Sequence, residues 1–336
     1  MTEWRYDANG NRLTQTGTDE WTLNVRSTNN QITSTTGTQA RTYTYDAAGN
    51  SLTYQTNTFT YSDSDRMKTV KVGSSTTTYV INALGQRIKK SGGSAGTVLY
   101  MYDEAGHTLG EYTSTGALTE ETIWLGDTPV ATIVPSGSTV AIYYVISDHL
   151  NTPKKISQPS SNKLAWRWDN DPFGIFAPNQ NPQSLGTFVY NLRYPGQMYD
   201  SEAALTYNYA RDYDPQTGRY VESDPLGLSA GMGTYTYVGD NPEMRFDVLG
   251  LDDKIKPEQA CKLVEKGYKP DDDSCGCQKD VVNNLCSCWT KYSWFYQIGQ
   301  LAVCTEKAYL TKSKCVQDCS STACNRTSAP AGRGSS

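Results

Sequence analysis

The sequence predicts an all-β repeat array followed by a small Cys-rich, mainly α C-terminal domain. The first observation is a motif, Tyr-Asp-Ala-Asn-Gly-Asn-Arg-Leu at 6–13, that recurs at 45–52, 79–88 and 102–109. The second is that Thr-, Tyr- and Val-rich segments, whose residue types suit half-buried strands, separate the copies. The third is that all nine cysteines lie in the last 85 residues, after a change of composition at Leu251.

Three of the four copies open with Tyr-Asp and place a glycine four positions after the tyrosine, where a tight turn needs positive φ. Each copy therefore predicts a strand, a turn and a second strand. A hairpin that cannot bury its own face must stack on its neighbours, so the repeats predict a continuous array. An ordinary β-sandwich with coincidental turns is the alternative.

Composition limits the possible functions. Residues 1–251 carry 18 Lys/Arg against 25 Asp/Glu, and residues 252–336 carry 12 against 10. Neither part is basic enough to indicate a nucleic-acid partner. The first residues lack the basic start and apolar run of a signal peptide, and no stretch has the eighteen apolar residues typical of a membrane span. If the protein is exported, we expect it to use another route.

Two short motifs mark the change of composition. Asp-Pro-Leu-Gly-Leu at 224–228 is followed at 247–251 by Asp-Val-Leu-Gly-Leu, so that Asp224 and Asp247 each begin a turn containing glycine. Two carboxylates that share one proton can hydrolyse a peptide bond, because one polarises the carbonyl while the other takes a proton from water. The alternative is that Asp224-Pro225 and its copy are only turn formers.

The region before these motifs has a specific vocabulary. It comprises Asp148–Pro153, Trp166–Asp169, Asp171–Gly174, Asn191–Gln197 and Tyr207–Tyr220. These segments, in this order, closely resemble the repeat-associated core of the Rhs (YD-repeat) family, found in bacterial polymorphic toxins and in the C subunits of insecticidal toxin complexes. The resemblance covers residues 1–251 and is strongest from Tyr143 onward. It implies repeats over 1–140, a core with a self-cleavage motif over 141–251, and a variable, toxic C-terminal domain over 252–336.

The resemblance also implies a reaction. In the family, the paired motifs form an intramolecular aspartyl protease that cuts just after the second Gly-Leu. By this correspondence Asp224 and Asp247 are the catalytic pair, supported by Arg219, and the bond between Leu251 and Asp252 is cut. The motif residues Pro225, Gly227 and Gly250 are present. The family's second proline is replaced by Val248, which removes a φ constraint but leaves the carboxylate, so we expect cleavage to survive, more slowly.

In the family the repeats form a hollow shell that encloses the C-terminal domain until delivery. The resemblance thus implies a cognate immunity protein, a secretion-system component or chaperone, and a secreted or cell-surface location. The array here is short for a complete cage, which indicates a truncated member or the last part of a longer protein. The target-cell molecule is not predicted.

The tail offers no obvious chemistry. Its density of cysteines favours disulfides, with an odd count and a connectivity that spacing does not give; the candidates are Cys261, Cys275, Cys277, Cys286, Cys288, Cys304, Cys315, Cys319 and Cys324. An all-thiolate zinc site is the less favoured alternative, because the C-x-C spacing differs from C-x-x-C. The tail contains no histidine, so no metal or other cofactor is predicted. Its aromatic residues fit a membrane-inserting face less well than a small stapled core.

A second function stays open. In it, a degenerate YD-repeat module binds carbohydrate or a partner protein at a surface, and the turn at Asp247 is inert. The first 251 residues contain 20 of the 24 tyrosines, although strands explain tyrosines equally well. Self-cleavage separates the two hypotheses.

Overall fold

The structure is a computed structural model and describes residues 2–17, 20–38, 40–93, 96–229 and 231–251. The chain divides into two units, Met1–Lys254 and Ile255–Ser336, and every described residue belongs to the first. The predicted all-β fold of this part is confirmed. The predicted Cys-rich α-helical domain, with its disulfides, lies outside the described residues, and the domain boundaries stay predictions. None of the described helices has the length and apolarity needed to cross a membrane.

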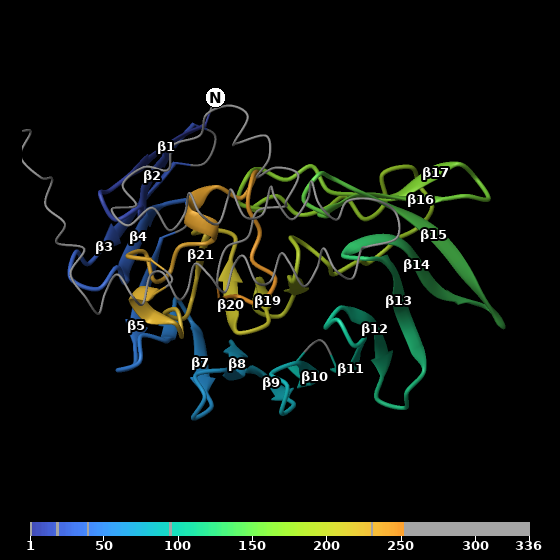
Figure 1. The fold of residues 1–336 in the computed structure, drawn as a ribbon, viewed down its shortest axis with the longest axis horizontal. Coiled ribbons are helices and arrows are strands. Elements are labelled where there is room, and N and C mark those ends of the chain that lie inside the picture. Colours follow the sequence, from blue (N-terminus) through green and yellow to red (C-terminus); the bar gives the residue numbers. More distant parts are fainter. Residues whose placement is uncertain (1, 18–19, 39, 94–95, 230, 252–336) are drawn as a thin grey trace, which may run out of the picture. The chain divides into compact units, whose positions relative to one another are not determined.

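A long antiparallel meander forms most of the described structure. From β1 to β17, each strand pairs with the next along the chain. The strands are β1 (Glu3–Tyr6), β2 (Arg12–Thr16), β3 (Trp21–Val25), β4 (Ile32–Gly37), β5 (Arg41–Tyr45), β6 (Ser51–Tyr54), β7 (Asn57–Tyr61), β8 (Met67–Val72), β9 (Ser75–Ile81), β10 (Arg87–Gly92), β11 (Gly96–Tyr102), β12 (Thr108–Thr113), β13 (Leu118–Leu125), β14 (Thr128–Ser136), β15 (Thr139–Ser147), β16 (Pro153–Gln158) and β17 (Lys163–Arg167). Figure 1 shows this sheet, blue to green, curving around the strands that follow it.

The Tyr-Asp motif forms the corners of the meander. Asp7 Oδ1 accepts the backbone N–H of Asn9 at 2.9 Å and that of Asn11 at 2.8 Å, while Gly10 has φ +80°. The second copy repeats this, with Asp46 Oδ1 2.8 Å from the N–H of Asn50. An aspartate that accepts the N–H groups ahead of it closes a turn by itself. The predicted strand, turn and strand are confirmed at these copies.

The sheet encloses a second, smaller one. Its strands are β18 (Met198–Asp200), β19 (Leu205–Asn208), β20 (Arg211–Asp214) and β21 (Arg219–Tyr220), followed by the 3₁₀ turns η2 (Gly227–Ser229) and η3 (Val238–Asp240). Every residue of β19, β20 and β21 is buried, because the strands have packed side chains on both faces. Aromatic residues dominate the largest core cluster, including Trp166, Tyr190, Tyr213 and Tyr237.

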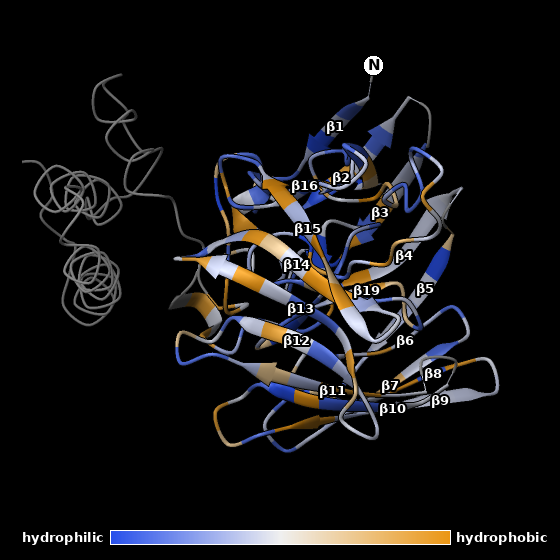
Figure 2. Cartoon of the chain, turned by 90° about the vertical axis from the view of Figure 1, so that its right-hand side faces the viewer, coloured by the Kyte–Doolittle hydropathy of each residue, from blue (hydrophilic) through white to orange (hydrophobic). Residues whose placement is uncertain are grey.

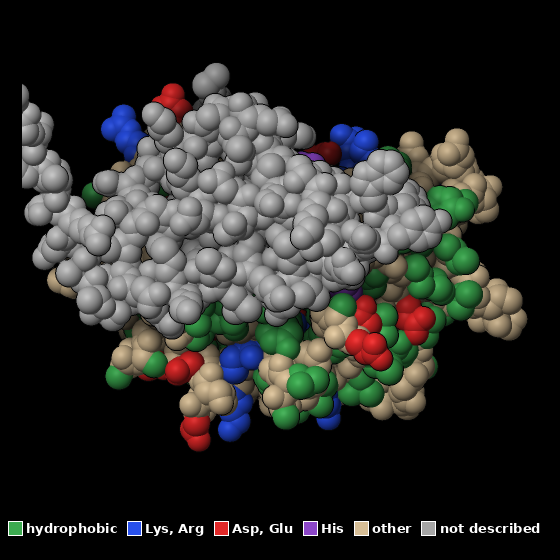
Figure 3. Space-filling model, in the orientation of Figure 1, with side chains coloured by type: hydrophobic (Ala, Val, Ile, Leu, Met, Phe, Trp, Pro, Cys, Tyr) green, Lys and Arg blue, Asp and Glu red, His purple; other side chains and the backbone are tan. Residues whose placement is uncertain are grey.

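The face of β13 and β15 that points away from the core is exposed to solvent. Ile123, Val140, Ile142, Tyr144 and Ile146 are all exposed there, since side chains along a strand alternate between faces and Val145 points into the core. Figure 2 shows apolar colour along β14 and β15, and Figure 3 shows hydrophobic side chains at the surface on that side of the molecule.

Buried ion pairs attach the inner sheet to the meander. Arg87 of β10 contacts Asp200 of β18 at 2.5 Å, and Lys90 lies 3.1 Å from Asp200 and 3.2 Å from Glu202. The Arg87 guanidinium also lies 4.1 Å from the centre of the Tyr207 ring. A buried charge needs a partner of opposite sign, so each sheet supplies what the other requires.

We expect Asp200→Ala to lower the free energy of unfolding by about 3–5 kcal/mol, because it leaves two buried cations without their shared carboxylate. Urea unfolding followed by tryptophan fluorescence measures this. The matched control is Asp169→Ala, which breaks the exposed pair with Arg167 at 2.7 Å and should cost about 0–1 kcal/mol. Equal losses for the two variants would contradict a structural role for the buried cluster.

Candidate functional site

Asp224 and Asp247 each begin a turn of the same kind. Asp224 Oδ1 accepts the N–H of Leu226 at 2.8 Å, and Asp247 Oδ1 accepts that of Leu249 at 3.2 Å. Both carboxylates are buried, with 8% and 2% of their residue surface exposed. The second turn forms with Val248 in the place of proline, because the Asp247 carboxylate supplies the closing hydrogen bond.

Arg211 brings the two carboxylates together. Its Nη2 lies 2.8 Å from Asp224 Oδ2 and 3.5 Å from Asp247 Oδ2. Its guanidinium carbon lies 3.7 Å from the centre of the Tyr220 ring. One buried cation thus contacts both residues that the sequence predicts as the catalytic pair.

Tyr220 contributes a second donor. Its hydroxyl donates to Asp247 Oδ2 at 2.8 Å. Burial raises the pKa of Tyr220 well above its usual range, and the Asp247 carboxylate raises it further, so the phenol keeps the proton that it donates. Arg211 and Tyr220 together fix the Oδ2 atom of Asp247.

The segment just before the predicted cut, residues 249–251, contacts Arg211 and Asp247 as well as Ala210. The Leu249 carbonyl accepts the N–H of Ala210 at 2.9 Å. Arg211 Nε donates to the Gly250 carbonyl at 2.5 Å, and the N–H of Leu251 donates to Asp247 Oδ1 at 3.1 Å. Asp252 lies outside the described residues, so the bond that is cut stays a prediction.

The two motif glycines have different constraints. Gly250 has φ +64°, and a Cβ there would lie 2.2 Å from the Asn208 carbonyl oxygen. Gly227 has φ +58° with open space around it. Only Gly250 is therefore required both by its conformation and by the close approach of another backbone.

Arg219 does not contact the two carboxylates in the way predicted. Its Nη2 donates to the Asn30 carbonyl at 2.5 Å, and its guanidinium lies 5.4 Å from the Tyr235 ring centre. The reason is strand alternation: Tyr220 faces Asp247, so its neighbour in β21 points the other way. The arginine at the site is Arg211.

Strand pairing could have identified Arg211 from the sequence. Tyr213 pairs directly with Tyr220, and Asp214 pairs with Arg219. Directly paired residues share a face, and so do residues two apart in one strand. Recognising 211–220 as a hairpin around Asp214-Pro215 would have placed Arg211 on the face of Tyr220.

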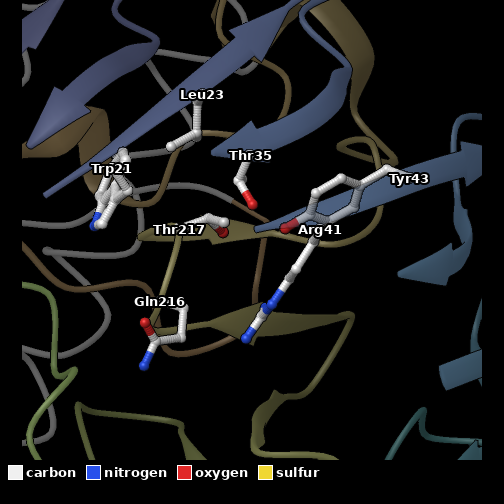
Figure 4. Close-up of a pocket in the computed structure, with 7 residues that line it drawn as sticks. All are labelled: Trp21, Leu23, Thr35, Arg41, Tyr43, Gln216 and Thr217. Atoms are coloured by element: carbon white, nitrogen blue, oxygen red, sulfur yellow. The ribbon is translucent and has the colours of Figure 1, made fainter. Parts of the chain in front are cut away.

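Small-molecule and metal sites are not evident in the described residues. Figure 4 shows a cavity lined by Trp21, Leu23, Thr35, Arg41, Tyr43, Gln216 and Thr217, with a volume of about 10 Å³. That volume is near the minimum for one water molecule and far below that of a ligand pocket. Within the same residues, no cluster of three or more His, Cys, Asp or Glu side chains is arranged to hold a metal ion.

We expect Gly250→Ala to be more destabilising than Gly227→Ala. Both substitutions put a Cβ on a left-handed residue, at a cost of about 1–2 kcal/mol, but only the first drives it into a neighbouring carbonyl. Thermal unfolding of the two variants beside the parent measures the difference. Similar melting temperatures for the two variants would contradict the close packing at Gly250.

Comparison with known proteins places this fold in a family. Residues 1–238 match the family described as Teneurin YD-shell. The chain is 35% identical over 121 residues to toxin protein Tse5 of Pseudomonas aeruginosa, covering 36% of this chain and 9% of that protein. It is 27% identical over 243 residues to double-stranded DNA deaminase toxin A of Burkholderia cenocepacia, covering 62% and 17%. The chain thus spans only a small part of these relatives.

Among solved structures, the chain matches that of TcdB2-TccC3-TEV with a TM-score of 0.45, 19% identity, and coverage of 74% of this chain and 17% of that one. The family match covers well over half of the chain, and the relatives include a protein named as an Rhs deoxyribonuclease, 36% identical over 108 residues, from Dickeya dadantii. The resemblance drawn from the motifs is thereby confirmed. The chain belongs to the Teneurin YD-shell family and is related to Rhs (YD-repeat) toxins.

Proposed function

We propose that this chain is part of an Rhs-type polymorphic toxin and that it cuts itself after Leu251 by aspartyl hydrolysis. The observation that carries the proposal is the position of Arg211, which contacts Asp224, Asp247 and the Gly250 carbonyl. The carboxylates and the segment to be cut are thus joined through one buried side chain. A substrate that is already bound needs no encounter step, which favours an intramolecular reaction.

The reaction would consume one water molecule. One carboxylate takes a proton from the water molecule while the water oxygen attacks the Leu251 carbonyl carbon. The other carboxyl group carries a proton and polarises the carbonyl oxygen. The C–N bond to Asp252 then breaks and the amine leaves with a proton. Arg211 offsets the repulsion between the carboxylates, which lets both lie in one buried site. Tyr220 holds one of them in place.

The released segment, 252–336, would be the toxic part, retained by the shell until delivery. The names of Tse5 and the Burkholderia deaminase identify those proteins as toxins, and the shared region supports the same organisation here. A chain of this kind implies a cognate immunity protein, a component or chaperone of a specialised secretion system, and a secreted or cell-surface destination. The activity of the segment does not follow from its relatives, because their named activities differ.

A second candidate function is binding of a partner protein without cleavage. The open apolar face of β13 and β15, which includes Ile142 and Tyr144, favours it, because exposed apolar patches mark interaction surfaces. Carbohydrate binding is less well supported, since the cavity shown in Figure 4 has room for about one water molecule. Self-cleavage distinguishes this candidate from the first.

The purified protein should separate under denaturing conditions into two fragments whose masses place the break after Leu251. Asp224→Asn and Asp247→Asn should each slow the cut by about 100-fold or more, since each removes one member of a pair that acts together. Intact-mass measurement over time reads the result.

The two arginines provide the matched control. Arg211→Met should abolish cleavage. Arg219→Met removes a guanidinium that is also buried but does not contact the carboxylates, so this variant should still cut. A parent chain that stays whole would reject self-cleavage and favour the binding function. Equal loss in both arginine variants would attribute the effect to folding, not to the site.

A further inference from the structure

A second pair of carboxyl groups lies next to the site and has no part in the reaction described so far. Asp212 follows Arg211 directly in β20, and Glu222 lies between β21 and Asp224. Both are buried, with 6% and 2% of their surface exposed. Burying two neighbouring carboxyl groups costs free energy, so a structural or functional reason for their position is expected.

Glu222 holds the strand that carries Arg211. Its Oε2 accepts the N–H of Asp212 at 2.8 Å, and this N–H belongs to the peptide bond that follows Arg211. On the other side of the same residue, the Asp212 carbonyl accepts the N–H of Val221 at 2.9 Å. The backbone beside Arg211 is therefore held at both its donor and its acceptor by the segment leading to Asp224.

We propose that Glu222 is a positioning residue for self-cleavage: its carboxyl group holds the strand of Arg211 and so keeps Arg211 on Asp224 and Asp247. The inference rests on the proposed self-cleavage and adds to it a residue and a dependence on pH. Glu222 links the two halves of the site, because it contacts the strand of Arg211 and lies two residues before Asp224.

The surroundings of Glu222 favour the uncharged form of its carboxyl group. Burial raises the pKa of Glu222 well above its usual range, and Asp212 raises it further, whereas Arg211 lowers it. The phenol of Tyr61 on β7 also faces both carboxyl groups. Burial and the neighbouring Asp212 thus favour the protonated form of Glu222 over its carboxylate.

Asp212 has its own surroundings. Burial raises its pKa to about 6, Arg87 and Arg66 lower it, and Asp200 raises it. A hydrogen bond with Glu222 also lowers it.

Loss of the proton from the Glu222 carboxyl group would affect Arg211. An ionised Glu222 attracts the guanidinium, as its effect on the Glu222 pKa indicates, and so competes with Asp224 and Asp247 for the same cation. Two adjacent buried charges also repel each other. We therefore expect self-cleavage to slow as the pH rises through the pKa of Glu222.

The test follows cleavage over time after refolding the full chain from urea at a series of pH values from about 6 to 10. The parent should cut more slowly at the alkaline end. Glu222→Gln keeps an acceptor for the Asp212 N–H and has no carboxyl proton to lose, so it should lose less of its rate at alkaline pH than the parent does. Glu222→Ala leaves that N–H unpaired and should cut about 10–100-fold more slowly at every pH.

Glu120→Gln is the matched control. Glu120 is a half-buried residue whose pKa is raised to about 7 by burial of its carboxyl group, and it lies on β13, where its Oε1 accepts the hydroxyl of Thr122 at 2.9 Å. This variant should keep the pH profile of the parent. A profile that Glu222→Gln leaves unchanged, or that Glu120→Gln alters equally, would overturn the proposal.

A second measurement keeps this inference separate from self-cleavage itself. In the Asp247→Asn chain, which should stay uncut, the ¹⁵N resonance of Arg211 Nε can be followed over the same pH range. It should shift at alkaline pH with Glu222 present and not with Glu222→Gln. If the Arg211 Nε resonance behaves in the same way with Glu222 and with Glu222→Gln, the positioning role is overturned. If the parent never cuts but the shift appears, only the proposed protease is overturned.

Discussion

One interaction recurs throughout this protein: an aspartate carboxylate accepts the backbone N–H groups two and four residues ahead of it. It closes the turn at Asp7, where both bonds are present, and the same pair occurs at Asp148 with Leu150 and Thr152. A meander of short strands needs many corners, and each corner must satisfy N–H groups that no strand partner reaches. Because the aspartate does this with its own side chain, the repeat needs only a few fixed residues.

The candidate site is built from the same interaction. Asp247 Oδ1 accepts the N–H groups of Leu249 and Leu251, as Asp7 does with Asn9 and Asn11. The difference lies in the second oxygen. In the repeat, Asp7 Oδ2 accepts the side-chain amide of Asn11, four residues away, whereas Asp247 Oδ2 meets Tyr220 and Arg211 from another strand. The corner at Asp247 thus differs from a repeat corner in that its second carboxylate oxygen has partners that are distant in sequence.

This distinction also explains how much the sequence predicts. The corners are local, so the Tyr-Asp copies, the turns at Asp224 and Asp247 and the all-β fold follow from residues a few positions apart. Arg211 is 13 residues before Asp224 and 36 before Asp247, and its role depends on the pairing of β20 with β21, which motif spacing alone does not give. The family resemblance indicates Arg219 as the supporting arginine, whereas strand alternation turns that side chain toward Asn30. The requirement for Gly250 likewise comes from Asn208, a residue brought close only by folding.

The site also depends on the shell around it. Arg211 belongs to a strand that is buried on both faces, so it reaches its place only when the meander has closed over the inner sheet. The contacts that close it include Arg87 with Asp200 and Arg41 with Asp214, each joining an outer strand to an inner one. Exposed carboxylates in an unfolded chain are far apart and solvated, and they do not act as a pair. If the proposed cut takes place, it therefore requires the folded protein, in which Arg211 contacts both carboxylates.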